Sequence, residues 1–129
     1  MLTAERLNDL NTRVIGAAIE VHRVLGPGLL ESAYEQCLER ELMPQRISVE
    51  RQVALPIEYK GLRIESGYRL DMMIERELAV ELKAVEALLP IHTAQVLTYL
   101  KVAGLRLGLL LNVNVDVMRK GVKRVANRL

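Results

Sequence analysis

The 129-residue chain has no Phe and no Trp, and its only large aromatic side chains are four tyrosines. A broad aromatic platform for stacking nucleic-acid bases is therefore not expected. The single cysteine, Cys37, excludes an internal disulfide framework and indicates a reducing compartment. Because Cys37 falls among apolar residues at helical spacing, we interpret it as a small core residue and not as a catalytic thiol.

Long uninterrupted apolar runs are also missing, so no segment is expected to span a membrane. The first residues, MLTAERLNDL, lack the pattern of a signal peptide, and we predict a cytoplasmic protein. The net charge of +2 does not by itself indicate a partner. The C-terminal stretch MRKGVKRVANRL has five basic residues and no acid, which suits a phosphate backbone or a solvated terminal element.

Half of the residues are hydrophobic, which predicts a single globular domain over residues 1–129. Apolar residues at helical spacing predict amphipathic helices, and Gly26–Pro27–Gly28 separates the first two. The three expected helices cover residues 3–25, 29–42 and 91–103.

The expected strands lie between and after these helices. Residues 49–85 alternate in polarity and contain turn signals at YKG and ESG, which predicts a meander of three or four strands. Residues 106–115 predict a strand buried on both faces, and residues 122–125 a short last strand. This order predicts an α/β fold in which a mixed central sheet with an antiparallel meander is flanked by helices on both faces.

Charged side chains interrupt two of the predicted strands. Alternate residues of a strand share a face, so Asp71 is expected opposite the apolar face of its strand, and Glu81 and Lys83 opposite that of the next. Two carboxylates that meet across a strand pair repel each other unless a cation such as Mg²⁺ or Mn²⁺ lies between them. A solvated sheet face with a Glu–Lys pair is the simpler alternative. The residues expected on the apolar face are Leu70, Met72, Ile74, Val80, Leu82 and Ala84.

A shared metal sets a condition on strand register. A two-residue loop at Arg76 and Glu77 would turn Glu81 to the wrong face, because a slip of one residue reverses every side chain. A three-residue loop over residues 75–77 instead pairs Asp71 with Glu81. No Asn-Gly or Asp-Gly demands the shorter turn, so we predict the odd-length loop or a bulge with the same effect.

The order Asp71, a turn, Glu81 and Lys83 resembles the motif of the PD-(D/E)XK nuclease superfamily, with Leu70 in place of the proline. GLLESAY, residues 28–34, spells G-x-x-E-x-x-Y and resembles the bacterial and archaeal family named after this motif. The resemblance continues through IEYKG, VELKAVE, AQVLTYLKVAG and GLLLNV. Residues 95–99 also match the Q-x-x-x-Y motif of RecB-like and Cas4-like nucleases.

This resemblance implies a three-layer α/β/α core of the restriction-endonuclease type. It implies Mg²⁺ or Mn²⁺ as cofactor and a catalytic role for four side chains: Asp71, Glu81, Lys83 and Glu31. The implied metal ligands are Asp71, Glu81 and the Leu82 backbone carbonyl, with Glu31 and His22 as further candidates. The implied substrate-binding or supporting residues are Gln95, Tyr99 and Tyr34.

Each of the additional candidates has a simpler structural explanation. Glu31, Glu35 and Glu39 follow one another at a spacing of four, which is typical of a solvated helix face. Gln95 and Tyr99 fit the edge of a helix, and His22 fits a structural histidine. If the Q-x-x-x-Y hypothesis holds, Gln95 and Tyr99 face the same cleft as Lys83 and their helix covers one face of the sheet.

Three functions follow from these patterns. The first is a metal-dependent nuclease that hydrolyses DNA or RNA, which the intact set of Asp71, Glu81 and Lys83 favours. The second is a nucleic-acid-binding or assembly module with a nuclease-like fold and weak or no turnover. The third is a small dimeric protein that acts through protein contacts, and a homodimer is also possible for a nuclease that grips a duplex.

Overall fold

The computed structural model describes residues 1–129, apart from the side chain of Ser66. Helix α1 begins where the Thr3 hydroxyl accepts a hydrogen bond from the Arg6 N–H at 3.2 Å, and it ends at Gly26, whose φ is 70°. No described helix is both long and apolar enough to cross a membrane. The elements are α1 (Ala4–Leu25), α2 (Glu31–Leu42), η1 (Met43–Gln45), β1 (Val49–Tyr59), β2 (Leu62–Ile74), β3 (Leu78–Lys83), α3 (Pro90–Ala103), β4 (Leu107–Asn112), η2 (Met118–Gly121) and β5 (Val122–Ala126).

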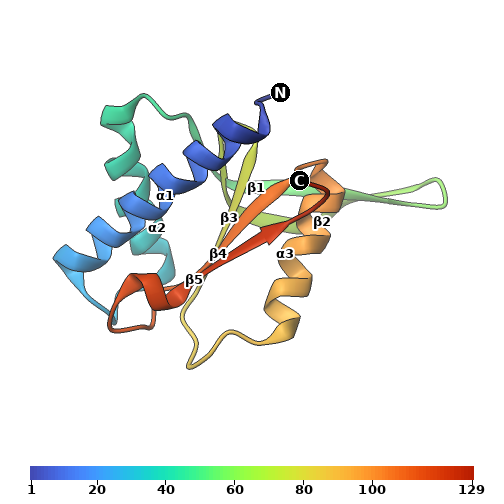
Figure 1. Ribbon diagram of the computed structural model, residues 1–129. Coiled ribbons are helices and arrows are strands. Elements are labelled where there is room, and N and C mark those ends of the chain that lie inside the picture. Colours follow the sequence, from blue (N-terminus) through green and yellow to red (C-terminus); the bar gives the residue numbers. More distant parts are fainter.

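The five strands form one mixed sheet in the order β1-β2-β3-β4-β5. Strands β1, β2 and β3 form the expected antiparallel meander, β4 is parallel to β3, and β5 is antiparallel to β4. Helices α1 and α2 cover one face of the sheet and α3 covers the other (Figure 1). The expected α/β/α arrangement is therefore confirmed, with one apolar core on each side of the sheet.

The turn between β2 and β3 has the predicted odd length. Ile74 pairs with Leu78 and Met72 with Val80, so residues 75–77 form the loop. Glu75 and Arg76 have φ values of 53° and 54°, a left-handed conformation that residues with a Cβ rarely adopt. The predicted register is thus confirmed as far as the Met72–Val80 pair, the last pair before Asp71 and Glu81.

The turn expected at ESG is wrong. Glu65 and Gly67 both lie within β2, and Ser66 between them carries the one side chain outside the described part. The β1–β2 register shifts between Leu55 and Ile57, because Pro56 cannot donate a ladder hydrogen bond. A bulge therefore absorbs the extra residues, and the hairpin continues as a long arm beyond the sheet (Figure 1).

The side chains of β1 and β2 change face where Gln52 lies opposite Asp71. Gln52 has a φ of 53°, and the β1–β2 ladder skips this pair. On β2, Met72 belongs to the core under α1 and α2, whereas Leu70 belongs to the core under α3. The expectation that Leu70 shares a face with Met72 and Ile74 is therefore wrong, because the irregular backbone interrupts the alternation.

Helix α3 lies close against β4 at Gly108. A Cβ added at Gly108 would lie 2.9 Å from Val96 Cγ1 and 3.2 Å from Leu100 Cδ2. Both α3 residues are buried, so the space above Gly108 is already filled. The distance between α3 and the sheet therefore depends on the absence of a side chain at this position.

We expect Gly108→Val to lower the free energy of unfolding by about 1–3 kcal/mol, because the added methyl groups overpack the α3 core. Urea denaturation followed by circular dichroism measures this change. The control is Gly16→Ala on the exposed side of α1, where a Cβ meets nothing within 4 Å and a gain of roughly 0.5–1 kcal/mol is expected. A Gly108→Val protein as stable as wild type would contradict the close packing.

Candidate active site

Strands β2 and β3 separate just beyond the Met72–Val80 pair, and two carboxylates bridge the gap. The Asp71 N–H donates to Glu81 Oε1 at 2.7 Å. The Leu82 N–H donates to Asp71 Oδ2 at 2.9 Å. Each acid is thus held by the main chain of the opposite strand, and the two side chains lie next to each other.

The environment of this pair favours a bound proton. The Glu81 side chain is only 5% exposed. Burial, and after it the negative charge of Asp71, raises the pKa of Glu81 to about 8, although the Asp71 N–H and the Lys83 charge act in the opposite direction. A hydrogen bond between the two carboxyl groups raises the pKa further. Without a cation, Glu81 therefore holds a proton near neutral pH.

The position of this proton suits a divalent cation. Glu81, which holds it, and the neighbouring Asp71 are both carboxyls, and oxygen is the ligand that Mg²⁺ and Mn²⁺ prefer. Among the described residues, no group of three or more His, Cys, Asp and Glu is placed to hold a metal. The residues present therefore fit a cation that two protein carboxylates hold and that takes its other ligands from a carbonyl, water or substrate.

Lys83 and Tyr99 lie close to this pair. The positive charge of Lys83 lowers the pKa of Glu81. Burial, together with the negative charges of Glu81 and Asp71, raises the pKa of the Tyr99 hydroxyl on α3. Gln95 is exposed one helical turn before Tyr99, which places it over the same face of the sheet. The expectation that α3 covers one face of the sheet is confirmed, and that face carries Glu81.

Glu31 lies apart from the acidic pair. It is exposed at the first position of α2 and lines a hollow of about 270 Å³ together with Ala84, Val113 and Asn114. No hydrogen bond or ion pair among the described residues joins Glu31 to Asp71 or Glu81. It is related to the site through this hollow, because Ala84 directly follows Lys83 in the chain.

His22 and Tyr34 belong to the packing between α1, α2 and the segment before β5. His22 is buried, and its Nε2 lies 2.6 Å from the Val115 carbonyl oxygen. Tyr34 is fully buried, its hydroxyl donates to the Ala18 carbonyl oxygen at 2.7 Å, and burial raises its pKa. The full burial of Tyr34 does not fit contact with a substrate, and a supporting role for it stays a prediction.

The sequence analysis did not predict that two residues, Glu35 and Gln52, take part in contacts near the site. Glu35 is only 3% exposed, so the expectation of a solvated acidic row is wrong for it. It accepts hydrogen bonds from Arg51 at 2.9 Å and from Gln52 at 3.0 Å, and Gln52 also approaches Asp71. The burial of Glu35 could have been suspected from its place in the helix. It directly follows Tyr34 and lies three residues before Leu38, and both of these residues are buried.

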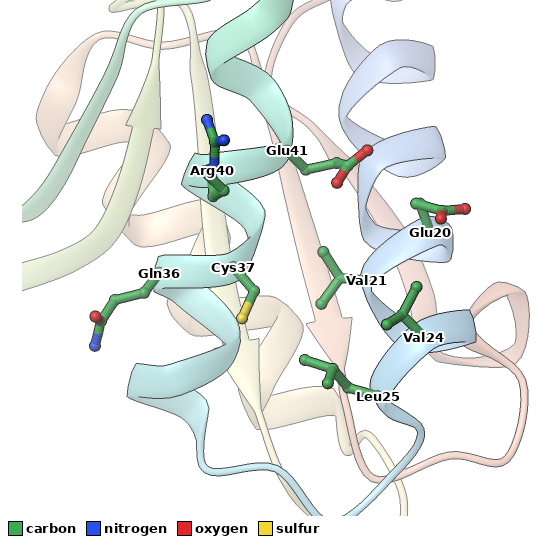
Figure 2. Close-up of a pocket in the computed structure, with 8 residues that line it drawn as sticks. All are labelled: Glu20, Val21, Val24, Leu25, Gln36, Cys37, Arg40 and Glu41. Carbon is green, nitrogen blue, oxygen red and sulfur yellow. The ribbon is translucent and has the colours of Figure 1, made fainter.

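A separate apolar groove of about 310 Å³ lies between α1 and α2. Figure 2 shows Val21, Leu25 and Cys37 pointing into the space between the two helices. The groove lies on the side of the sheet opposite α3, and its only carboxylates, Glu20 and Glu41, line it from different helices. It is therefore distinct from the acidic pair.

With this fold and geometry established, comparison with known proteins identifies the class. The sequence model described as the PD-(D/E)XK nuclease superfamily matches residues 8–125. The chain therefore belongs to the PD-(D/E)XK nuclease superfamily. The matched segment contains Asp71, Glu81 and Lys83 in the order that the name of the superfamily specifies.

The fold is also found in a solved structure. The crystal structure of SSO0001 is similar to this chain with a TM-score of 0.54 and 18% sequence identity. The similarity covers 92% of this chain and 66% of SSO0001, so this chain spans only part of that protein's length. This likeness supports the fold alone. No curated protein matches the chain.

We expect the metal-free protein to lose stability as the pH rises from about 4.5 to about 8 because of Glu81. The folded state holds a proton on Glu81 that the unfolded chain has already released, so unfolding becomes easier over this window. Glu81→Gln removes the titrating group. The difference in unfolding free energy between wild type and Glu81→Gln should change by roughly 2–4 kcal/mol over the window.

Urea denaturation in a chelator at several pH values measures this difference. Comparing the two proteins at each pH cancels the titration of all other groups. A difference that does not change with pH would contradict the raised pKa of Glu81.

Proposed function

We propose that residues 1–129 form a single domain that acts as a metal-dependent nuclease and hydrolyses phosphodiester bonds of DNA or RNA. The observation that carries this proposal is the contact between the Asp71 and Glu81 carboxyl groups beside Lys83. Burial of the Glu81 carboxyl beside Asp71 is costly, and in this superfamily a metal ion bound by the two carboxylates explains it best. The small size and single cysteine agree with a cytoplasmic protein.

The proposed metal ligands are Asp71, Glu81 and the backbone carbonyl of Leu82. The N–H and C=O groups of one strand residue point to the same side. Because the Leu82 N–H donates to Asp71, the Leu82 carbonyl is also directed toward the gap beside β2. A bound Mg²⁺ or Mn²⁺ would supply positive charge at the scissile phosphate and acidify a coordinated water.

The remaining roles fall to side chains around this pair. Lys83 follows Glu81 by two residues on the same strand, and its ammonium group can donate to the attacking water or to a phosphate oxygen. Tyr99 and Gln95 on α3 would hold the nucleic acid over the same face. For Glu31 we propose that it modulates the metal site from the hollow beside Ala84. The bond between His22 and Val115 supports a structural role for that histidine.

The second candidate is a nucleic-acid-binding module with little or no turnover. The observation that favours it is the small number of ligands, because Asp71 and Glu81 form no group of three with another His, Cys, Asp or Glu among the described residues. A weakly held cation would leave Glu81 protonated. A homodimer that grips a duplex is compatible with both candidates and stays a prediction.

We expect Mn²⁺ to bind wild type and to release about one proton on binding near pH 7, because the cation replaces the proton on Glu81. Isothermal titration calorimetry in two buffers with different ionisation enthalpies measures both quantities. Asp71→Ala should lose more than about tenfold in affinity. The control is Asp9→Ala, which removes an exposed carboxylate from α1. Undiminished binding in Asp71→Ala would contradict the site.

We expect wild type to cleave mixed DNA and RNA substrates in Mg²⁺ or Mn²⁺ and Lys83→Ala to lose at least about 10²-fold of the rate, because the group that orients the water is gone. Lys101→Ala, purified in parallel, is the matched control, since Lys101 is an exposed lysine on α3. Equal cleavage by Lys83→Ala and wild type would contradict the assignment. Substrate binding without cleavage by wild type would favour the second candidate.

A further inference from the structure

We propose that Gln52 is a positioning residue that orients the Asp71 carboxylate for metal binding, with Glu35 as its anchor on α2. This inference rests on the metal site of the proposed function and concerns residues that the superfamily motif does not include. It starts from a hydrogen-bonded series that runs from α2, through β1, to the acidic pair. The series joins α2 to the acidic pair at the point where the side chains of β1 and β2 change face.

The Gln52 amide group contacts both carboxylates. Its Nε2 lies 3.0 Å and 3.3 Å from the two oxygens of Glu35 and 3.5 Å from Asp71 Oδ1. An amide nitrogen has two hydrogens, so it can donate to both acids at once. Because both neighbours are acceptors, the amide must present its NH₂ group and not its oxygen. The orientation of Gln52 is therefore fixed by its surroundings.

Glu35 is held firmly enough to act as an anchor. It is buried, and a buried carboxylate is stable only with partners. Arg51 donates to Glu35 at 2.9 Å and also lies 3.5 Å from Glu39, so the guanidinium is fixed by two acids of α2. The Gln52 amide completes the hydrogen bonding of Glu35.

The backbone of Gln52 is arranged for this contact. Its φ of 53° is unusual for a residue with a Cβ, and Gln52 lies inside a strand and not in a turn. In regular alternation, neighbouring residues point to opposite faces, yet both Arg51 and Gln52 reach Glu35. An unfavourable conformation that the surrounding contacts maintain is typical of a functional position.

The consequence is that both Asp71 oxygens have a donor. The Leu82 N–H contacts Oδ2 at 2.9 Å, and Gln52 approaches Oδ1 at 3.5 Å. A carboxylate restrained at both oxygens cannot rotate freely, so it presents its remaining lone pairs in one direction. Supporting hydrogen bonds of this kind typically change metal affinity by about 10–100-fold.

The decisive variant is Gln52→Gly, because glycine removes the amide and accepts the left-handed backbone without strain. Its matched control is Arg46→Gly, which makes the same change at an exposed residue with a φ of 57° that has no part in the site. Gln52→Asn also tolerates this backbone, but its amide is one methylene shorter and cannot bridge Glu35 and Asp71.

Mn²⁺ affinity is measured by calorimetry and the melting temperature by circular dichroism. We expect Gln52→Gly and Gln52→Asn to bind Mn²⁺ at least about tenfold more weakly than wild type. Arg46→Gly should bind Mn²⁺ with the affinity of wild type. In Gln52→Gly, relief of the strained left-handed backbone offsets the loss of a donor to Glu35, so the melting temperature should stay close to that of wild type. In cleavage assays, the Mn²⁺ concentration for half-maximal rate should rise by the same factor, and the rate at saturating Mn²⁺ should be preserved.

The outcomes separate this inference from the proposed function. Equal Mn²⁺ affinity in wild type and Gln52→Gly would overturn the positioning role and leave the metal site intact. The same loss of affinity in Arg46→Gly would also overturn it, because the effect would then come from the backbone. If wild type binds no Mn²⁺, the metal site of the proposed function is wrong, and the positioning role is overturned with it.

Discussion

The register of the β2–β3 hairpin is the constraint on which the rest of the site depends. A slip of one residue would separate Asp71 from Glu81 and turn the apolar side chains of one strand away from their core. The turn that sets the register places Glu75 and Arg76 in a left-handed conformation, which costs about 1–2 kcal/mol for each residue. Two hydrogen bonds of 2.8 Å between Glu75 and Ser48 help to offset this cost. The site thus depends on contacts made at the far end of its strands.

The fold also determines how far the Glu81 carboxyl is buried from water. The chain passes from β3 through α3 to the parallel strand β4, so the helix that carries Tyr99 directly follows the strand that carries Glu81. Close packing of α3 at Gly108 brings this helix down onto the sheet. The resulting burial opposes the charge on Glu81, and a cation would relieve that penalty. The feature that lowers the stability of the metal-free protein is therefore the one that prepares it for a ligand.

The sequence predicted the regular parts of the molecule because alternation and turn chemistry are local properties. It predicted the hairpin register because two charges on buried strands had to share a face. It failed at Leu70, since nothing in the sequence marks Gln52 as a left-handed residue within a strand. It failed at Glu35, because its spacing from Glu31 matched a solvated row, whereas its charge is balanced by Arg51 on β1. Local patterns cannot reveal partners that only the folded chain brings together.

The irregularities of β1 have a consequence for solubility. β1 is eleven residues long and forms one edge of the sheet, and a long, regular edge offers unpaired N–H and C=O groups to strands of other molecules. The left-handed backbone at Gln52 and the missing N–H at Pro56 divide this edge into short segments. A strand interrupted twice is a poor template for intermolecular β-pairing. The backbone distortion next to the acidic pair thereby also protects the chain from aggregation.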